Sequence, residues 1–578
     1  MNTLVIVLIA AVCLIAGYTF YGSWLAKKWG IDPKAKTPAV AKNDGQDYVP
    51  TDGWTVFAHQ FSSIAGAGPV TGAIQAAAFG WVPVLLWVIL GGIFFGAVTD
   101  FGALYASVKN EGKSMGLLIE KYIGKTGRKL FLLFCWLFTL IVIAAFADMV
   151  AGTFNAYTVA DGVTSLSPAA QTNGAAGSIS LMFIVFAMVF GVIQKHLHLT
   201  GWKETLAGLA CTVAAFAIGM AFPVVAGKDT WSYLTFAYIF LAAVMPMWLL
   251  MQPRDFMTTF MFAGMIIGAV VGLVVAHPTM NLPAYTGFKN AKMGDMFPIL
   301  FVTVACGAVS GFHSLVSSGT SSKTVSNEKD MLKVGYGAMV LESLLAVIAL
   351  CVAGASAAAD GTPADGTPFQ VFSRGVASFF VGFGLDQHFA SVFMTMCVSA
   401  LALTSLDAVA RIGRMSFQEL FSVDDMEHAE GWRKLLCNVY FSTFITLVFG
   451  FILTKIGYAN IWPLFGSANQ LLSALVLATL CVFLKVTGRS NKMIFPPLVI
   501  MLCVTFTALV QRLIAMVKAI SNAAAVTIPA GETTWGAVFI ANGLQLILAV
   551  LLIVLGLNIV FHSFKAYKNA EHNSEAKV

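Results

Sequence analysis

Long apolar runs separated by short polar connections follow one another along the whole chain. A membrane-spanning helix needs roughly 20 mostly apolar residues, and fifteen stretches meet this requirement. They cover residues 3–25, 54–78, 83–108, 130–151, 178–194, 204–226, 231–251, 256–276, 297–321, 334–356, 388–410, 435–454, 462–484, 493–511 and 535–561. The first stretch lacks the basic start and the small-residue cleavage site of a signal peptide. The pattern predicts an all-α polytopic membrane protein with about 15 transmembrane helices.

Lys and Arg are concentrated in every second connection between these stretches. With the N-terminus outside, the inside connections are 26–53, 109–129, 195–203, 252–255, 322–333, 411–434, 485–492 and the tail after residue 561. They hold 27 of the 34 Lys and Arg residues, and the outside connections hold the other seven. Positive residues favour the cytoplasmic side of a membrane. The distribution predicts an N-terminus outside and a C-terminus inside.

Composition excludes several classes of protein. The 578 residues are 58% hydrophobic and 11% charged, so they cannot coat the surfaces of soluble domains, which are roughly a quarter charged. The net charge of +6 is scattered, without the basic stripe of a nucleic-acid-binding protein. The nine cysteines lie in apolar stretches without a CxxC pair, so buried thiols are expected, with no disulfide framework, metal site or cofactor. The lipid bilayer is the expected environment, and the sequence gives no oligomeric state.

The polar connections are too small to hold an active site. The longest outside connections, 152–177 and 357–387, are nearly uncharged and rich in small residues. The sequence contains no HExxH, GxSxG or Walker A motif. A carrier is therefore favoured over an enzyme or a channel.

Residues that interrupt helices gather at the expected mid-depth of the second stretch. Gly66, Gly68, Pro69 and Gly72 follow Ser62 and Ser63 there. Proline removes a backbone donor and glycine allows close approach, and non-helical backbone in a bilayer is tolerated only where protein or a cavity surrounds it. A small-residue packing face is the alternative. We predict a discontinuous helix that contributes to a substrate site.

Two further stretches carry similar signals. The ninth contains Ser310, His313, Ser314, Ser317, Ser318 and Thr320, and the seventh contains Pro246. Broken helices in pairs are typical of transporters built from inverted repeats. Stretches two and seven run in opposite directions five elements apart, which favours a five-plus-five repeat of the LeuT type. Pairing stretches two and nine is the rival. The predicted parts are 1–53, an extra helix and loop; 54–226 and 231–414, the repeats; and 415–578, extra helices and a tail.

Ionisable residues inside a membrane are functional candidates. His59 and His313 can exchange protons near neutral pH, and Asp100 is a relay or a structural partner; Ser317, Ser318 and Thr320 are alternative ligands of a coupling ion. Glu342 is a weaker proton candidate. Arg254, Asp255, Asp407 and Arg411 are predicted to gate the inner side or to fix helix ends, because Asp407 and Arg411 are spaced for pairing on one helix face.

Six strings resemble the carbon starvation protein A family of bacterial inner-membrane transporters. They are HQFSSIAGAGPVTG (59–72), GAVTDF (96–101), QPRDF (252–256), ACGAVSGFHSLVSSGTSSK (305–323), LTSLDAVARIGR (403–414) and IWPLFGSANQLL (461–472). They span nearly the whole chain in family order, although the best-known members carry more residues between or after them. The resemblance implies the amino-acid/polyamine/organocation superfamily. It also implies proton-coupled uptake of pyruvate, with an older association with peptide use during carbon starvation.

A carboxylate substrate is compatible with the residues at the predicted break. Unpaired N–H groups at a half-helix N-terminus attract anions, and Gly66 to Gly72 can present such groups beside the hydroxyls of Ser62, Ser63 and Ser314. No Lys or Arg is then required at mid-membrane. Peptide or amino-acid import and sodium coupling stay open as alternatives.

Overall fold

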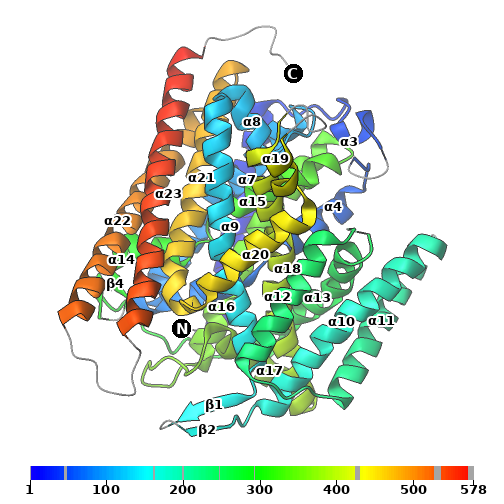
Figure 1. The fold of residues 1–578 in the computed structure, drawn as a ribbon. Helices are drawn as coiled ribbons and strands as arrows, with labels where there is room; N and C mark the ends of the chain where they lie inside the picture. The colour runs from blue at the N-terminus through cyan, green and yellow to red at the C-terminus, as the bar shows by residue number, and fades with distance from the viewer. Residues whose placement is uncertain are drawn as a thin grey trace.

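The computed structural model describes residues 2–44, 48–160, 163–197, 201–246, 248–291, 293–423, 430–525 and 535–570, and its regular structure is mainly helical (Figure 1). The α-helices are α1 (Thr3–Ala16), α2 (Ser23–Trp29), α3 (Pro38–Ala41), α4 (Gly53–Ile64), α5 (Ala67–Ala76), α6 (Trp81–Gly91), α7 (Ala97–Val108), α8 (Met115–Tyr122), α9 (Lys125–Phe154), α10 (Ala170–Leu197), α11 (Trp202–Ala221), α12 (Lys228–Val244), α13 (Met251–Ala276), α14 (Met296–Thr303), α15 (Gly311–Gly319), α16 (Ala338–Ser356), α17 (Pro368–Gly382), α18 (Gln387–Phe421), α19 (Gly431–Leu436), α20 (Val439–Thr454), α21 (Tyr458–Val486), α22 (Phe495–Ala525) and α23 (Trp535–Asn569).

Shorter elements complete the description. The π-helical segments are η1 (Gly17–Gly22), η3 (Gly92–Gly96) and η6 (Leu332–Gly337), and the 3-10 segments are η2 (Ala77–Phe79), η4 (Ser321–Lys323), η5 (Glu328–Asp330) and η7 (Lys492–Ile494). Two antiparallel hairpins pair β1 (Tyr157–Ala160) with β2 (Val163–Leu166) and β3 (Lys289–Asn290) with β4 (Gly294–Asp295). All four strands are short, so helices determine the architecture.

Eleven helical segments in the described part of the chain are long and apolar enough to cross a membrane. The other four predicted stretches correspond to two interrupted helices, α4–α5 and α14–α15, and to two shorter ones, α12 and α20, of 17 and 16 residues. Interruption and length explain why these four do not qualify. A multi-pass membrane protein is confirmed, and the total of fifteen spans stays a prediction.

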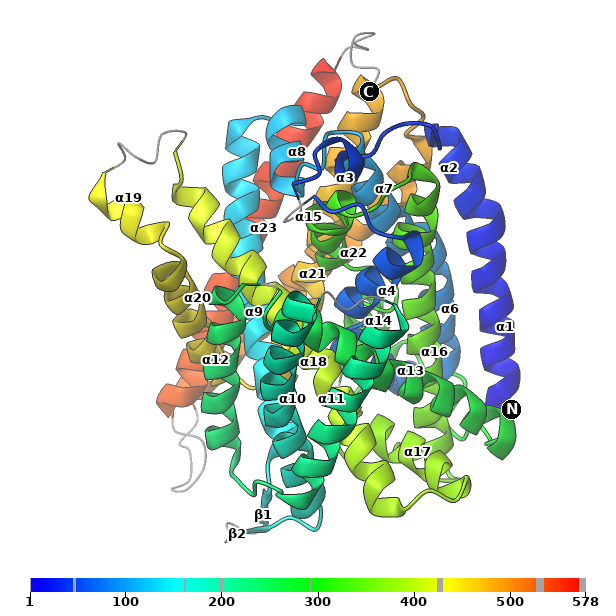
Figure 2. The ribbon, with the colours of Figure 1, turned by 90° about the vertical axis from the view of Figure 1, so that its right-hand side faces the viewer.

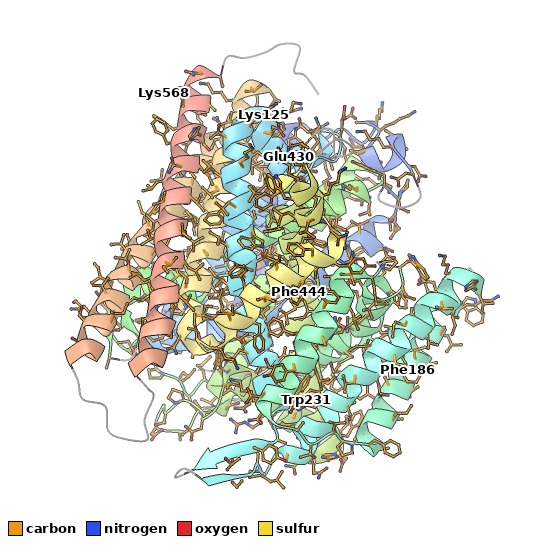
Figure 3. All side chains as sticks on the ribbon, viewed as in Figure 1. Lys125, Phe186, Trp231, Glu430, Phe444 and Lys568 are labelled. Carbon is orange, nitrogen blue, oxygen red and sulfur yellow. The ribbon has the colours of Figure 1, made fainter. Side chains whose placement is uncertain are left out.

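The two ends of the molecule differ in the way that the distribution of Lys and Arg predicts. Figures 1 and 2 place α3, α8, α19 and the C-terminal end of α23 at one end, and the start of α1 and the β1–β2 hairpin at the other. Figure 3 shows Lys125, at the start of α9, and Lys568, near the end of α23, at the end that holds α8. We call this the inner end, following the predicted orientation.

The orientation can be tested with a reporter that is active only outside the cytoplasm. Fusions within 152–177 or 357–387 are expected to be active, because these connections contain β1–β2 and α17 at the outer end. Fusions within 109–129 or 411–434 are expected to be inactive, since positive residues favour the cytoplasmic side. Activity in 109–129 would overturn the orientation.

The two interrupted helices lie in stretches two and nine. Between α4 and α5 the break covers Ala65 and Gly66, and between α14 and α15 it covers 304–310. Helix α12 runs without a break to Val244, and Pro246 lies in the connection to α13. The prediction that Pro246 interrupts a membrane helix is therefore wrong; this proline follows a helix end.

Each interrupted helix is followed by a helix with a π-helical segment. Segment η3 separates α6 from α7, and η6 leads into α16. Helices α9 and α18 pack along each other in the centre, with α20 and α21 also against α9. In both halves of the chain, an interrupted helix is followed by a helix that contains a π-helical segment. An internal structural repeat would produce this order.

All nine cysteines are free. Five are buried, as predicted, and Cys306 is one of them; Cys211 and Cys437 are half-buried, and Cys13 and Cys503 are exposed at the surface. The prediction of buried thiols is therefore wrong for the last two, whose helices face outward from the bundle.

Candidate functional site

The break between α4 and α5 is tightly surrounded by other helices. Gly66 precedes the first residue of α5 with extended backbone, and no side chain caps this helix end. A Cβ atom at Gly66 would overlap the Ser405 hydroxyl of α18, and one at Gly68 would overlap the Cys306 side chain. Pro69, in the first turn of α5, has no N–H, so Ala67 and Gly68 supply the free N–H groups at this end.

The break between α14 and α15 is held by a side chain from α21. Asn469 Oδ1 accepts hydrogen bonds from the backbone N–H of Phe312, at 3.1 Å, and from the Ser310 hydroxyl, also at 3.1 Å. Asn469 Nδ2 donates to Ser310 Oγ at 3.0 Å and to Cys306 Sγ at 3.4 Å. The positive end of α15 is therefore already occupied by an amide oxygen.

A small cavity lies where the two breaks meet. Its volume is about 10 Å³, close to the smallest space that holds one water molecule. Its lining residues come from α4–α5, α9, α14–α15, α18 and α21: Ile64, Gly66, Gly68, Phe138, Val142, Phe146, Cys306, Phe312, Ser405, Val409, Phe465 and Asn469. The lining is mainly aromatic and aliphatic and contains no charged side chain.

A buried group of three ionisable side chains lies beside this cavity, and we call it the buried triad. His313 Nδ1 is 3.0 Å from Asp100 Oδ2, and His313 Nε2 is 3.3 Å from Glu342 Oε2. All three side chains are fully buried. His313 lies on α15, Asp100 on α7 just after η3, and Glu342 on α16 just after η6.

The buried triad contains polar atoms that form no hydrogen bond with other described residues. Within the described ranges, Asp100 Oδ1, Glu342 Oε1 and Oε2, and His313 Nε2 form no hydrogen bond. Burying uncompensated charge is costly, so carboxylates that share protons with an imidazole are more favourable than free carboxylates. The two imidazole nitrogens point at different carboxylates, so the three side chains do not converge on one point as metal ligands would. Among the described residues, no group of three His, Cys, Asp or Glu side chains is arranged to hold a metal ion.

A second buried polar group joins α12, α13 and α18. Arg254 pairs with Asp407, which also accepts a hydrogen bond from the Tyr238 hydroxyl. The Arg254 guanidinium lies 5.2 Å from the centre of the Tyr238 ring. Arg411 does not pair with Asp407, as its spacing had suggested; it donates to the carbonyls of Ala242 and Met245 at the end of α12.

Breaking the ion pair between Arg254 and Asp407 is expected to destabilise the fold strongly. Asp407→Ala leaves Arg254 charged and 2% exposed, and removing one partner of a buried pair costs about 3–5 kcal/mol. The thermal midpoint of the purified protein in detergent should fall clearly. Lys42→Ala, which removes the exposed Lys42–Glu111 pair at 2.8 Å, is the control and should change it little. Equal midpoints for both variants would contradict the prediction.

The remaining predicted residues are distributed around these centres. Ser62 and Ser63 are buried near the end of α4, and the Ser62 hydroxyl donates to the His59 carbonyl. His59 is half-buried and is not part of the buried triad. Ser314 is buried, with a hydroxyl that has no partner in the described part of the chain. Asp255 is buried without an ion pair among the described residues, and its Oδ1 has no hydrogen-bond partner there.

The C-terminal part of α15 holds the other predicted ion ligands. Ser317 accepts a hydrogen bond from Gln60, Ser318 donates to the Ser314 carbonyl, and Thr320 follows the last residue of the helix. Pro246 is not among the residues that line the cavity. Sequence reasoning missed Tyr238, Gln60, Cys306 and Ser405 as members of these sites. Gln60, Cys306 and Ser405 stand inside the quoted strings, so their polarity within apolar stretches was the available signal.

A model of the carbon starvation protein CstA family matches residues 2–360 and 355–508 of the chain. The chain belongs to this family. The CstA relatives include the peptide transporter CstA of Escherichia coli strain K12, 31% identical over 87% of this chain and 80% of that protein. The pyruvate/proton symporter BtsT of the same organism is 29% identical over 87% and 80%, and the peptide transporter CstA of Bacillus subtilis strain 168 is 31% identical over 82% and 84%. The predicted family resemblance is confirmed, and this CstA-family protein is a membrane transporter.

Two solved transporter structures are similar to the CstA-family chain at low identity. A manganese transporter of Eremococcus coleocola is 9% identical, with a TM-score of 0.48 over 91% of this chain and 99% of that one. MhsT in complex with L-phenylalanine is 13% identical, with a TM-score of 0.45 over 88% and 99%. The LeuT-type repeat stays a prediction.

Proposed function

We propose that the protein is a secondary active transporter that imports pyruvate or a similar small carboxylate, together with protons, during carbon starvation. The cavity between the two helix breaks is the observation that carries this proposal. It is enclosed by both interrupted helices and by α9, α18 and α21. A site formed between several helices is what a carrier requires, since the site must open to each side of the membrane in turn.

The cavity has the polarity for one small anion. The free N–H groups of Ala67 and Gly68 supply donors at the positive end of α5, and Ser405 and Asn469 supply side-chain polar atoms. Phe138, Phe146 and Phe465 provide an apolar wall. At about 10 Å³ the cavity must widen for any substrate, and pyruvate requires far less widening than a peptide. Peptide import is the second candidate, because several relatives carry the name peptide transporter.

The buried triad supports protons as the coupling ion. A histidine between two carboxylates has neighbours with which it can exchange a proton. The triad is close to the substrate cavity, because Cys306 and Asn469 line the cavity while Ser310, bonded to Asn469, begins the helix that carries His313. Substrate binding in the cavity and proton binding at the triad can therefore influence each other through the short segment from Cys306 to His313.

We also propose inverted repeats that begin at α4 and α14, with an additional helix pair in the first repeat. The interrupted helices and the π-helical segments η3 and η6 support this arrangement. It replaces the predicted boundary at residue 231, which depended on a break at Pro246. Location in the bacterial inner membrane, with the N-terminus outside, and a gating role for Arg254, Asp255, Asp407 and Arg411 belong to the same proposal.

The test uses purified protein in liposomes. Labelled pyruvate uptake is measured under an inward proton gradient, under an inward sodium gradient at constant pH, and by exchange against unlabelled pyruvate. We expect exchange, and accumulation only with the proton gradient. Accumulation driven by sodium alone would overturn proton coupling and favour Ser317, Ser318 and Thr320 as ion ligands. Uptake of dipeptides without exchange of pyruvate would establish the second candidate.

A further inference from the structure

A track of buried polar side chains runs from the buried triad toward the inner end of the molecule. Helix α15 carries His313 and, one turn later, Ser317, and η4 begins with Ser321. Gln60 of α4 joins the two serines: its Nε2 donates to Ser317 Oγ at 2.8 Å, and its Oε1 accepts from Ser321 Oγ at 2.5 Å. Gln60, Ser317 and Ser321 are all fully buried.

The inner end of this track reaches partly exposed residues. Thr320, Lys323 and Thr324 are half-buried, and the Thr324 hydroxyl donates to the Ser321 carbonyl at 3.2 Å. Ser107 of α7 donates to the carbonyls of Ser318 and Lys113, which ties the same region to the Lys-rich connection after α7. Polar groups therefore continue from Ser317 to the surface of the inner end.

On the side that faces away from the inner end, Asp100 and Glu342 are followed by small, closely packed residues. One turn further from the inner end, η3 ends at Gly96 and α16 presents Ala346, and both are buried. A Cβ atom at Gly96 would lie 2.5 Å from the Ala308 carbonyl, so backbone closes this side. The track of Gln60, Ser317 and Ser321 is thus the polar route that leads from the triad to the inner end.

We propose that Gln60, Ser317 and Ser321 form the path by which protons leave the buried triad for the cytoplasm. This inference rests on the proposed proton-coupled function. The Gln60 amide lies between the two serine hydroxyls, so water is the co-reactant that carries the proton from His313 to Ser317 and from Ser317 to Ser321. Each hydroxyl oxygen accepts one proton from a water and releases its own to the next water, so the net charge of each hydroxyl is unchanged. Gln60 is a positioning residue, because its amide holds the two hydroxyls in line.

The surroundings of His313 are consistent with release along this route. The ionisable groups that face the imidazole are Asp100 from α7 and Glu342 from α16. The connection before α15 contributes the Cys306 thiol, while α21 and α4 contribute the neutral amides of Asn469 and Gln60. No described Lys or Arg forms an ion pair with Asp100 or Glu342. A proton that leaves the triad inward therefore meets neutral donors and acceptors.

The experiment compares net uptake with exchange in liposomes. The path variants are Gln60→Met and Ser317→Ala, and the control is Thr479→Val, which removes a buried hydroxyl that donates to the Leu475 carbonyl within α21. Exchange of labelled for unlabelled pyruvate at equal pH does not require proton release, whereas net uptake does. We expect net uptake under an inward proton gradient to slow by about 10-fold or more in the path variants, with exchange close to wild type.

The outcomes separate the path from the proposed function. Net uptake equal to wild type in both path variants would overturn the path, and so would a parallel loss of exchange and net uptake in both variants, because that pattern indicates a structural role. Failure of the wild-type protein to exchange pyruvate or to accumulate it with protons would instead overturn the proposed function and the path with it. The control variant should match the wild type in both assays.

Discussion

Replacing His313 by Gln is expected to abolish pyruvate accumulation driven by a proton gradient while exchange continues. Gln keeps hydrogen-bonding capacity between Asp100 and Glu342, which flank the imidazole at 3.0 and 3.3 Å, but it cannot take up a proton at physiological pH. Without a group that releases the proton inside, the inside-to-outside concentration ratio should fall to about one. The measurement is labelled pyruvate in liposomes under an inward proton gradient.

His59→Gln is the matched control for this prediction. His59 carries the same side chain on the neighbouring interrupted helix, but it is half-buried and does not form part of the buried triad. The His59 variant should accumulate pyruvate as the wild type does. If the His313 variant also accumulates it, the triad does not couple transport to protons; if only the His59 variant fails, coupling belongs to α4.

Gly68→Leu is expected to abolish both exchange and net uptake. A side chain at this position would overlap Cys306, so α5 and the connection before α15 would be forced apart at the cavity. Small-to-large changes in closely packed sites typically cost about 1–3 kcal/mol, which is enough to misplace the free N–H groups of α5. Uptake per folded protein, quantified by size-exclusion chromatography, is the measurement.

Gly152→Leu is the control, because a side chain at Gly152 of α9 meets nothing within 4 Å. A second variant, Gly68→Ala combined with Cys306→Gly, removes the overlapping group and should recover activity relative to Gly68→Ala alone. Normal transport by Gly68→Leu would contradict the prediction and would show that Gly68 has no role in the substrate site beyond helix packing.

The sequence located one helix break well and misjudged another for a physical reason. Gly66 and Pro69 correctly indicated the interruption of the second stretch. Pro246 gave the same signal but lies beyond Val244, the last residue of α12. Proline both kinks helices and follows their ends, and composition alone does not separate the two cases. The break at 304–310 contains no proline, and its position depends on contacts with Asn469.

The partners of ionisable residues depend on tertiary contacts that local spacing does not encode. Asp100, His313 and Glu342 were each candidates, yet 213 residues separate Asp100 from His313. The spacing of Asp407 and Arg411 allowed a pair on one helix face, but Arg254 lies closer across the packing of α13 against α18. Helix periodicity predicts which side chains share a face, whereas the neighbouring helix decides which charges meet.

The asymmetry between the two half-helix ends has a consequence for selectivity. Asn469 occupies the first turn of α15, whereas the first turn of α5 is uncapped. Of the two described helix ends, only that of α5 is therefore ready to receive an anionic group, and Phe138, Phe146 and Phe465 supply an aromatic part of the remaining lining. A second carboxylate would be placed against aromatic rings without a donor, which is costly. We expect the carrier to exclude dicarboxylates such as malonate and to admit acids whose far end is a methyl group.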